Sequence, residues 1–151
     1  MKKRYVTHSP EETEQAAKEI ASELSPGWVV ALYGDLGAGK TVFSRGFARA
    51  LNITEAVSSP TFTIVQEYPC EKGVLYHLDL YRIDDTDAAL AFGVDEFLYD
   101  KNAYALVEWP ERMDKGLFPK NTLSIRIERG KDRENERILS IEDLPSPEKK
   151  K

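Results

Sequence analysis

The chain has 151 residues, a formal net charge of −5, 41% hydrophobic residues and 31% charged residues. These values predict one globular domain with a single core, and they argue against a disordered chain, a fibrous repeat or a surface that binds bare nucleic acid by counterion release. Cys70 is the only cysteine and no run of about 18 apolar residues occurs, so a disulfide framework and a membrane span are disfavoured and a cytoplasmic location is expected.

The first third of the chain predicts a strand, a helix, a second strand and a second helix. The first strand is expected over residues 4–9, and Ser9 begins a capping box with proline at the first helical position. The helix should end at 25–27, where serine, proline and glycine follow one another. A buried strand over 28–34 and a helix from Lys40 complete this part.

The rest of the chain predicts mainly strands, because β-branched and aromatic residues dominate it. The strands are expected at residues 62–68, 74–82, 103–109, 122–128 and 137–143. One helix should start near Asp87. The short polar segment 129–135 favours a hairpin between the last two strands, which gives an antiparallel extension. We expect one domain over residues 1–144 and a flexible polar tail over 145–151.

A glycine-rich loop follows the second predicted strand. Gly34, Gly39, Lys40 and Thr41 satisfy the phosphate-binding pattern GxxxxGK[ST] of a P-loop. The backbone N–H groups of such a loop form an anion nest, the lysine reaches the outer phosphates, and the threonine hydroxyl binds the bridging magnesium ion. The predicted nucleotide-contacting residues are Asp35, Leu36, Gly37, Ala38, Gly39, Lys40, Thr41 and Val42.

Nucleotide hydrolysis needs a further acidic group, and two carboxylates end predicted strands. Asp79 and Glu108 should lie where ligands gather at the carboxyl ends of an α/β sheet. We expect Glu108, with Thr41, to hold magnesium and Asp79 to orient or deprotonate the attacking water, although the two roles could be reversed. His77 is on the same strand face as Asp79, but packing or hydrogen bonding is the commoner role of a single histidine there.

Two absent sequence motifs bear on whether the bound nucleotide carries guanine or adenine. The NKxD and DxxG segments of regulatory GTPases do not occur, which favours adenine. Trp109 is a candidate surface on which adenine could stack, although a core position is an equal alternative. A small-molecule kinase stays open as an alternative, with lid arginines drawn from Arg82, Arg112, Arg133 and Arg137.

Further motifs accompany the P-loop over most of the chain. They are GDLGAGKTVFSRGF at 34–47, SPTFTIVQEY at 59–68, YHLDLYRI at 76–83, GVDEFL at 93–98 and VEWPE at 107–111. Together they resemble the bacterial TsaE family, also called YjeE, the small ATPases needed to make threonylcarbamoyladenosine in tRNA. The alignment ends near Leu117, which leaves Arg133 and Arg137 without an assigned role.

The resemblance implies an α/β P-loop NTPase-like sandwich with a mixed sheet. It implies that ATP and Mg²⁺ are the cofactors and that ATP hydrolysis is slow alone and stimulated by partners. The partners would be TsaD and TsaB, which transfer the threonylcarbamoyl group to tRNAs that read codons beginning with A. Contact with tRNA would be indirect, through that complex, and no DNA or membrane partner is expected.

The SPTFT segment resembles the switch-like loop of the family. Ser59, Thr61 and Thr63 supply hydroxyl groups on a segment made stiff by Pro60. Nucleotide switches order such a segment through the γ-phosphate and magnesium, so we expect residues 57–65 to differ between the ATP and ADP states. An ordinary strand entry is the alternative.

Overall fold

The computed structural model describes residues 2–35, 37–55, 57, 64–131 and 134–143. Its elements are β1 (Lys2–Thr7), α1 (Pro10–Ser22), β2 (Val29–Tyr33), α2 (Lys40–Ala50), β3 (Val65–Cys70), β4 (Gly73–Asp79), α3 (Thr86–Phe92), α4 (Val94–Leu98), β5 (Ala103–Glu108), the 3₁₀ helices η1 (Pro110–Arg112) and η2 (Lys115–Leu117), β6 (Thr122–Arg129) and β7 (Arg137–Asp143). The predicted polar tail, residues 145–151, lies outside the described residues.

Within this described part, seven strands form one mixed sheet in the order β1-β7-β6-β2-β5-β4-β3. The four central strands β6, β2, β5 and β4 are parallel, whereas β3, β7 and β1 pair antiparallel at the two edges. β2 and β5 are buried along their whole length, as central parallel strands with helices on both faces should be. The predicted α/β class, mixed sheet and antiparallel C-terminal extension are confirmed.

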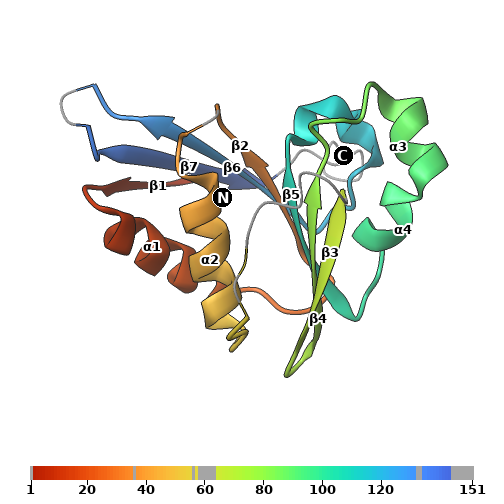
Figure 1. The fold of residues 1–151 in the computed structure, drawn as a ribbon, viewed down its shortest axis with the longest axis horizontal. Helices are drawn as coiled ribbons and strands as arrows, with labels where there is room; N and C mark the ends of the chain where they lie inside the picture. The colour runs from red at the N-terminus through yellow and green to blue at the C-terminus, as the bar shows by residue number, and fades with distance from the viewer. Residues whose placement is uncertain (1, 36, 56, 58–63, 132–133, 144–151) are drawn as a thin grey trace.

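Helices cover both faces of the sheet, which gives three layers (Figure 1). α1 and α2 lie on one face, where Phe43 and Phe47 of α2 pack with Tyr104 of β5. α3 and α4 lie on the other face, over apolar side chains of β2, β4 and β5. The helix α1 begins as predicted, because the Ser9 side chain accepts a hydrogen bond from the N–H of Glu12.

The sequence prediction did not include α4 or the strand partner of β1. α4 is five residues long, too short for an apolar repeat to show, and it follows Gly93, whose φ of 93° is left-handed. β1 pairs with β7, so the antiparallel extension contains a strand from the start of the chain. No helix in the described ranges is long and apolar enough to span a bilayer.

Candidate nucleotide site

The P-loop joins the carboxyl end of β2 to the start of α2. Gly37 has a φ of 79° and Gly39, the residue before α2, has a φ of 110°. Both values lie in the left-handed region that side chains with a Cβ atom rarely adopt, which explains the two glycines. Lys40 is buried at the first helical position, and the next residue, Thr41, is exposed. The loop therefore has the predicted strand–loop–helix context. Leu36 lies outside the described residues.

Two arginines from the C-terminal hairpin contact the backbone of the P-loop. Nη2 of Arg129 donates to the carbonyl of Gly37 at 3.2 Å, and Nε of Arg137 donates to the carbonyl of Ala38 at 2.9 Å. Arg137 also donates to backbone carbonyls within its own hairpin. These arginines reach the loop because β6 is the parallel neighbour of β2. The hairpin thus holds the P-loop from the side opposite to β5.

The two predicted acidic residues lie side by side. Asp79 ends β4 and Glu108 ends β5, and they are direct register partners in the parallel pair. Both side chains are buried, with 6% and 4% of their surface exposed. The Oδ1 atom of Asp79 accepts a hydrogen bond from the N–H of Tyr81 at 2.9 Å. Glu108 is also the register partner of Leu32 on β2, so both carboxylates lie on the P-loop edge of the sheet.

His77 makes a hydrogen bond, which is one of the two roles that the sequence predicted for it, and its partner is Glu108. Its Nε2 lies 2.6 Å from Oε2 of Glu108, and both side chains are almost fully buried. Because Nε2 contacts an ionisable oxygen in a buried setting, this contact is a charge-assisted hydrogen bond when Glu108 is ionised. The available signal was the alternation of the strand, which puts His77 and Asp79 on one face of β4.

Lys40 lies in an unusual environment for a cation. Its Nζ is buried, has no hydrogen-bond partner among the described residues, and lies 4.0 Å from the centre of the Trp109 ring. Burial lowers the pKa of Lys40, and the negative charges of Glu108, Glu111, Asp79 and Asp35 oppose this effect. Lys40 therefore has no hydrogen-bond acceptor among the described residues, although acidic residues lie near it. An anionic ligand that carries a cation would supply the acceptor and shield the acidic residues.

Trp109 follows β5 directly and has a left-handed φ of 57°. Its ring packs on Tyr81 with centroids 5.0 Å apart, and the guanidinium of Arg112 lies 5.4 Å from the Tyr81 ring. The indole of Trp109 therefore lies against Lys40, at the end of the site where the outer phosphates are expected. Its stacking on adenine stays a prediction.

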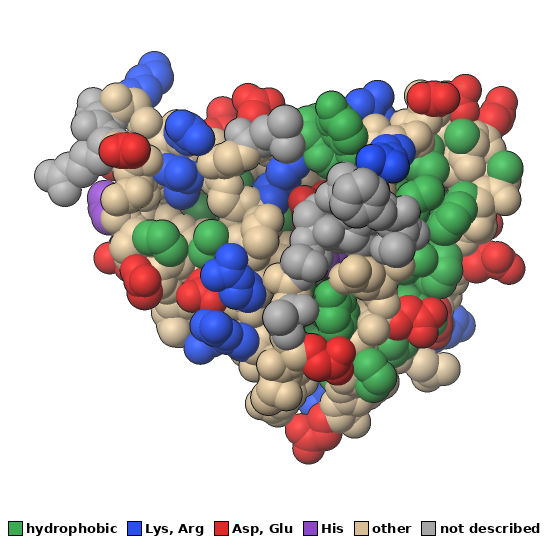
Figure 2. All heavy atoms as spheres, viewed as in Figure 1, with side chains coloured by type: hydrophobic (Ala, Val, Ile, Leu, Met, Phe, Trp, Pro, Cys, Tyr) green, Lys and Arg blue, Asp and Glu red, His purple; other side chains and the backbone are tan. Residues whose placement is uncertain are grey.

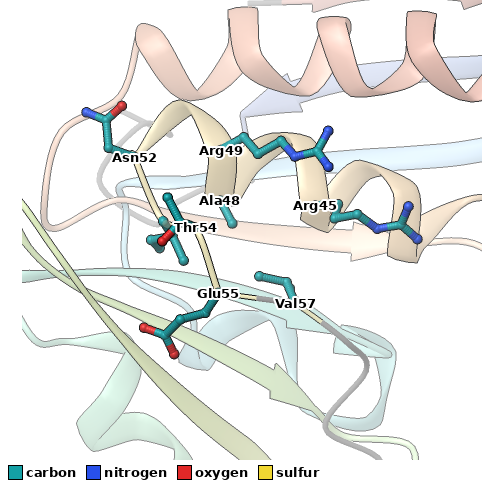
Figure 3. Close-up of a pocket in the computed structure, with 8 residues that line it drawn as sticks. Arg45, Ala48, Arg49, Asn52, Thr54, Glu55 and Val57 are labelled. Atoms are coloured by element: carbon teal, nitrogen blue, oxygen red, sulfur yellow. The ribbon is translucent and has the colours of Figure 1, made fainter.

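Two hollows lie near α2, one beside the P-loop and the other beside the C-terminal half of the helix. A hollow of about 440 Å³ adjoins the loop, lined by Gly34, Asp35, Ala38, Glu111, Arg126, Ile127, Glu128 and Arg129. Another of about 540 Å³ lies beside the C-terminal half of α2, and it is lined by Arg45, Ala48, Arg49, Asn52, Ile53, Thr54, Glu55 and Val57 (Figure 3). None of the predicted site residues lines the second hollow. The predicted site therefore belongs to the P-loop edge.

Some predictions fall on residues that the structure leaves undescribed. These are the hydroxyl-bearing switch-like residues Ser59, Thr61 and Thr63, and the candidate lid residue Arg133. Among the described residues, hydrophobic side chains gather on the side of the molecule that carries α3 and α4 (Figure 2). The predicted switch therefore stays a prediction.

Comparison with known proteins gives the relatives of the chain. The family model described as threonylcarbamoyl adenosine biosynthesis protein TsaE matches residues 7–138. The chain belongs to the TsaE family. This match extends past Leu117 into β6 and β7, so the resemblance covers more of the chain than the motifs alone indicated.

Individual TsaE proteins support the assignment. The tRNA threonylcarbamoyladenosine biosynthesis protein TsaE of Bacillus subtilis is 46% identical over 130 residues, which cover 86% of this chain and 80% of the relative. The TsaE protein of Aquifex aeolicus is 44% identical over 112 residues, covering 73% of this chain and 78% of the relative. The crystal structure of YdiB from Bacillus subtilis matches with a TM-score of 0.79 and 37% identity, covering 96% of this chain and 87% of that chain.

Proposed function

We propose that the chain is an ATPase accessory factor for the threonylcarbamoyladenosine modification of tRNAs that read codons beginning with A. Its membership of the TsaE family gives it a role in threonylcarbamoyladenosine biosynthesis. In the proposed function, the chain binds ATP and Mg²⁺, and it hydrolyses ATP faster on a complex of TsaD and TsaB than alone. The observation that carries the proposal is the buried ammonium of Lys40 in a P-loop, which has no hydrogen-bond acceptor among the described residues and lies near the charges of Asp79 and Glu108.

ATP fits this site through opposite charges. The phosphates would accept hydrogen bonds from the P-loop N–H groups, and the β- and γ-phosphates would take Lys40 away from the Trp109 ring. The four acidic residues that oppose the lowered pKa of Lys40 would repel the phosphates unless a cation shielded them. A nucleotide bound to a divalent cation would both accept hydrogen bonds from Lys40 and shield the acidic residues from the phosphates.

The oxygen ligands of the site suit Mg²⁺. Thr41 and Glu108 would hold the ion together with phosphate oxygens, and Asp79 is the alternative ligand. Among the residues that the structure describes, no three or more His, Cys, Asp or Glu side chains form a group that could hold a metal. Mg²⁺ binds through one or two protein oxygens plus phosphates and water, and Thr41 with Glu108 or Asp79 would supply those protein oxygens. The bound ion would neutralise charge on the β- and γ-phosphates.

Hydrolysis would then use the second carboxylate. A water oxygen attacks the γ-phosphorus, the bond to the β–γ bridging oxygen breaks, and the products are ADP and inorganic phosphate. Asp79 would orient this water or accept its proton, because its buried carboxylate lies next to Glu108 at the same strand edge. Lys40 would stabilise the charge that develops on the transferred phosphoryl group.

The test is phosphate release by the purified chain with MgATP, alone and with TsaD and TsaB. We expect slow release alone and an increase with the partners. A panel of small metabolites is added in parallel, because a small-molecule kinase would phosphorylate one of them instead. Binding of ATP with no phosphate release in any mixture would refute the ATPase and leave only a nucleotide-binding module.

A further inference from the structure

We propose that His77 is a positioning residue for Glu108, and that its Nε2 holds one carboxylate oxygen so that the other is available to the divalent cation. This inference rests on the proposed function, because it gives Glu108 a metal to bind. The direct observation is the 2.6 Å contact between Nε2 of His77 and Oε2 of Glu108.

The register of β4 and β5 makes this contact selective. His77 is the register partner of Leu106, two residues before Glu108, so the imidazole reaches Glu108 diagonally across the strand pair. Asp79 lies directly opposite Glu108 but is held by a different group, the N–H of Tyr81. The imidazole of His77 thus contacts the carboxylate of Glu108, and the N–H of Tyr81 contacts that of Asp79.

The direction of the hydrogen bond follows from the chemistry of a carboxylate. With Glu108 ionised, Nε2 donates its hydrogen to Oε2, since a carboxylate can only accept. Nδ1 of His77 is buried and has no hydrogen-bond partner among the described residues. The contact with Nε2 therefore occupies Oε2 of Glu108 and leaves the other carboxylate oxygen for a cation.

Orientation, rather than stability, is what this contact supplies. A buried polar pair contributes little net stability, because desolvation offsets the attraction between its members. It does fix the rotamer of Glu108, whose flexible side chain would otherwise sample several positions. Hydrogen-bonded partners of metal-binding carboxylates commonly change metal affinity or activity by about 10- to 100-fold when they are removed. The expected effect of losing Nε2 therefore falls on metal binding.

Three variants of the full chain isolate the Nε2 atom. His77→Gln keeps an amide N–H near the position of Nε2, His77→Asn keeps one only near the position of Nδ1, and His77→Leu keeps neither. The measurement is titration of Mn²⁺ into the complex with a non-hydrolysable ATP analogue, followed by electron paramagnetic resonance. We expect His77→Gln to bind Mn²⁺ nearly as the parent does, and the other two variants to bind it about 10- to 100-fold more weakly.

The controls separate positioning from packing. Binding of the analogue in EDTA and the thermal unfolding midpoint are measured for every variant, and we expect analogue binding to stay within about twofold of the parent. A packing role would lower the unfolding midpoint and analogue binding together in all three. If the asparagine or leucine variant binds Mn²⁺ like the parent, or if the glutamine variant weakens it as much as they do, the assignment is wrong. The glutamine and asparagine pair decides the matter even if the leucine variant does not fold.

The readout also separates this inference from the proposed function. Mn²⁺ binding needs no hydrolysis, so it can be measured if TsaD and TsaB fail to stimulate phosphate release. In that outcome the ATPase proposal fails, and the glutamine and asparagine variants still test His77. If the parent binds no Mn²⁺ with the analogue, Glu108 has no metal to hold and both ideas fall together.

Discussion

Lys40 is a buried lysine whose ammonium group makes no hydrogen bond within the described residues. Its ammonium faces an aromatic ring and four nearby acidic residues, but no hydrogen-bond acceptor among the described residues. The ring offers a weak substitute for an anion, because a cation over a tryptophan face gains about 0.5–2 kcal/mol. Phosphate oxygens would offer charge-assisted hydrogen bonds, so the lysine is expected to exchange one contact for the other on binding.

Replacing this lysine should remove ATP binding without unfolding the chain. In Lys40→Ala the only cation of the P-loop is lost, and the neighbouring carboxylates then repel the phosphates. Lys40→Met, which keeps the length of the side chain against Trp109, serves as the matched variant. Titration calorimetry with MgATP measures both, and thermal unfolding checks the fold. A variant that binds ATP as tightly as the parent would contradict the placement of the loop.

Asp79 and Glu108 should act as one unit in catalysis. Because they are neighbours that serve one metal and one water, Asp79→Ala and Glu108→Ala are each expected to leave most nucleotide binding intact and to cut phosphate release by about 100-fold or more. The double variant should be hardly slower than either single one, since residues that act together are not additive. The measurement is phosphate release with TsaD and TsaB. A single variant with the parental rate would identify its residue as a bystander.

At the scale of elements, the hairpin of β6 and β7 acts on the P-loop. Arg129 and Arg137 bind carbonyls of Gly37 and Ala38, so they hold these carbonyls outward and leave the N–H groups of the loop for the phosphates. Nothing in the local sequence of the P-loop indicates this support, because the two contacts join residues 92 and 99 positions apart.

Loss of this support should weaken nucleotide binding. Arg137→Ala removes a hydrogen bond from a charged donor, which is worth about 1.5–3 kcal/mol, so the dissociation constant for ATP should rise about 10- to 100-fold. Arg45→Ala, at an exposed position of α2 that lines the other hollow, is the control and should bind ATP as the parent does. Calorimetry at fixed Mg²⁺ measures both. Equal affinities of the two variants would exclude a role for the hairpin.

A second relation between elements is the close approach of α1 and α2. A Cβ atom at Gly46 of α2 would lie 2.4 Å from the carbonyl oxygen of Glu14 on α1. The two backbones are therefore in contact, and Arg49 and Glu14 form an ion pair at 2.8 Å beside them. Gly46→Ala should force the helices apart and destabilise the protein by about 1–3 kcal/mol, as overpacking of a core does. Chemical denaturation measures this; an unchanged midpoint would show that the helices can separate freely.

At the scale of the whole molecule, the sequence predicted those site residues whose local pattern places them at the carboxyl ends of the sheet strands. The strand ends at Asp79 and Glu108 were predictable, because parallel strands bring their carboxyl ends together. The P-loop was predictable from its spacing and its flanking elements. The contacts of the hairpin arginines were not, because they depend on the order of the strands in the sheet, which no local pattern in the sequence shows. The domain limit at residue 144 stays a prediction.

The whole molecule should be required for tRNA modification in its host. Depletion of the chain should lower threonylcarbamoyladenosine in tRNA, measured by mass analysis of nucleosides, because the TsaE relatives from Bacillus subtilis and Aquifex aeolicus carry the name of that pathway. Restoring the parent chain should return the modification, and restoring Lys40→Ala should not. Unchanged threonylcarbamoyladenosine after depletion would refute the proposed role.

The pairing of β1 with β7 has a consequence for the order in which the chain can acquire its activity. β1 precedes the other described elements in the chain, yet its only strand partner in the described sheet is β7, more than a hundred residues later. The strands that flank β2, which are β5 and β6, and the hairpin that carries Arg129 and Arg137 also follow the P-loop. A nascent chain can therefore contain the P-loop and α2 long before the strands that support them, and its affinity for nucleotide should mature only after β7 has been made.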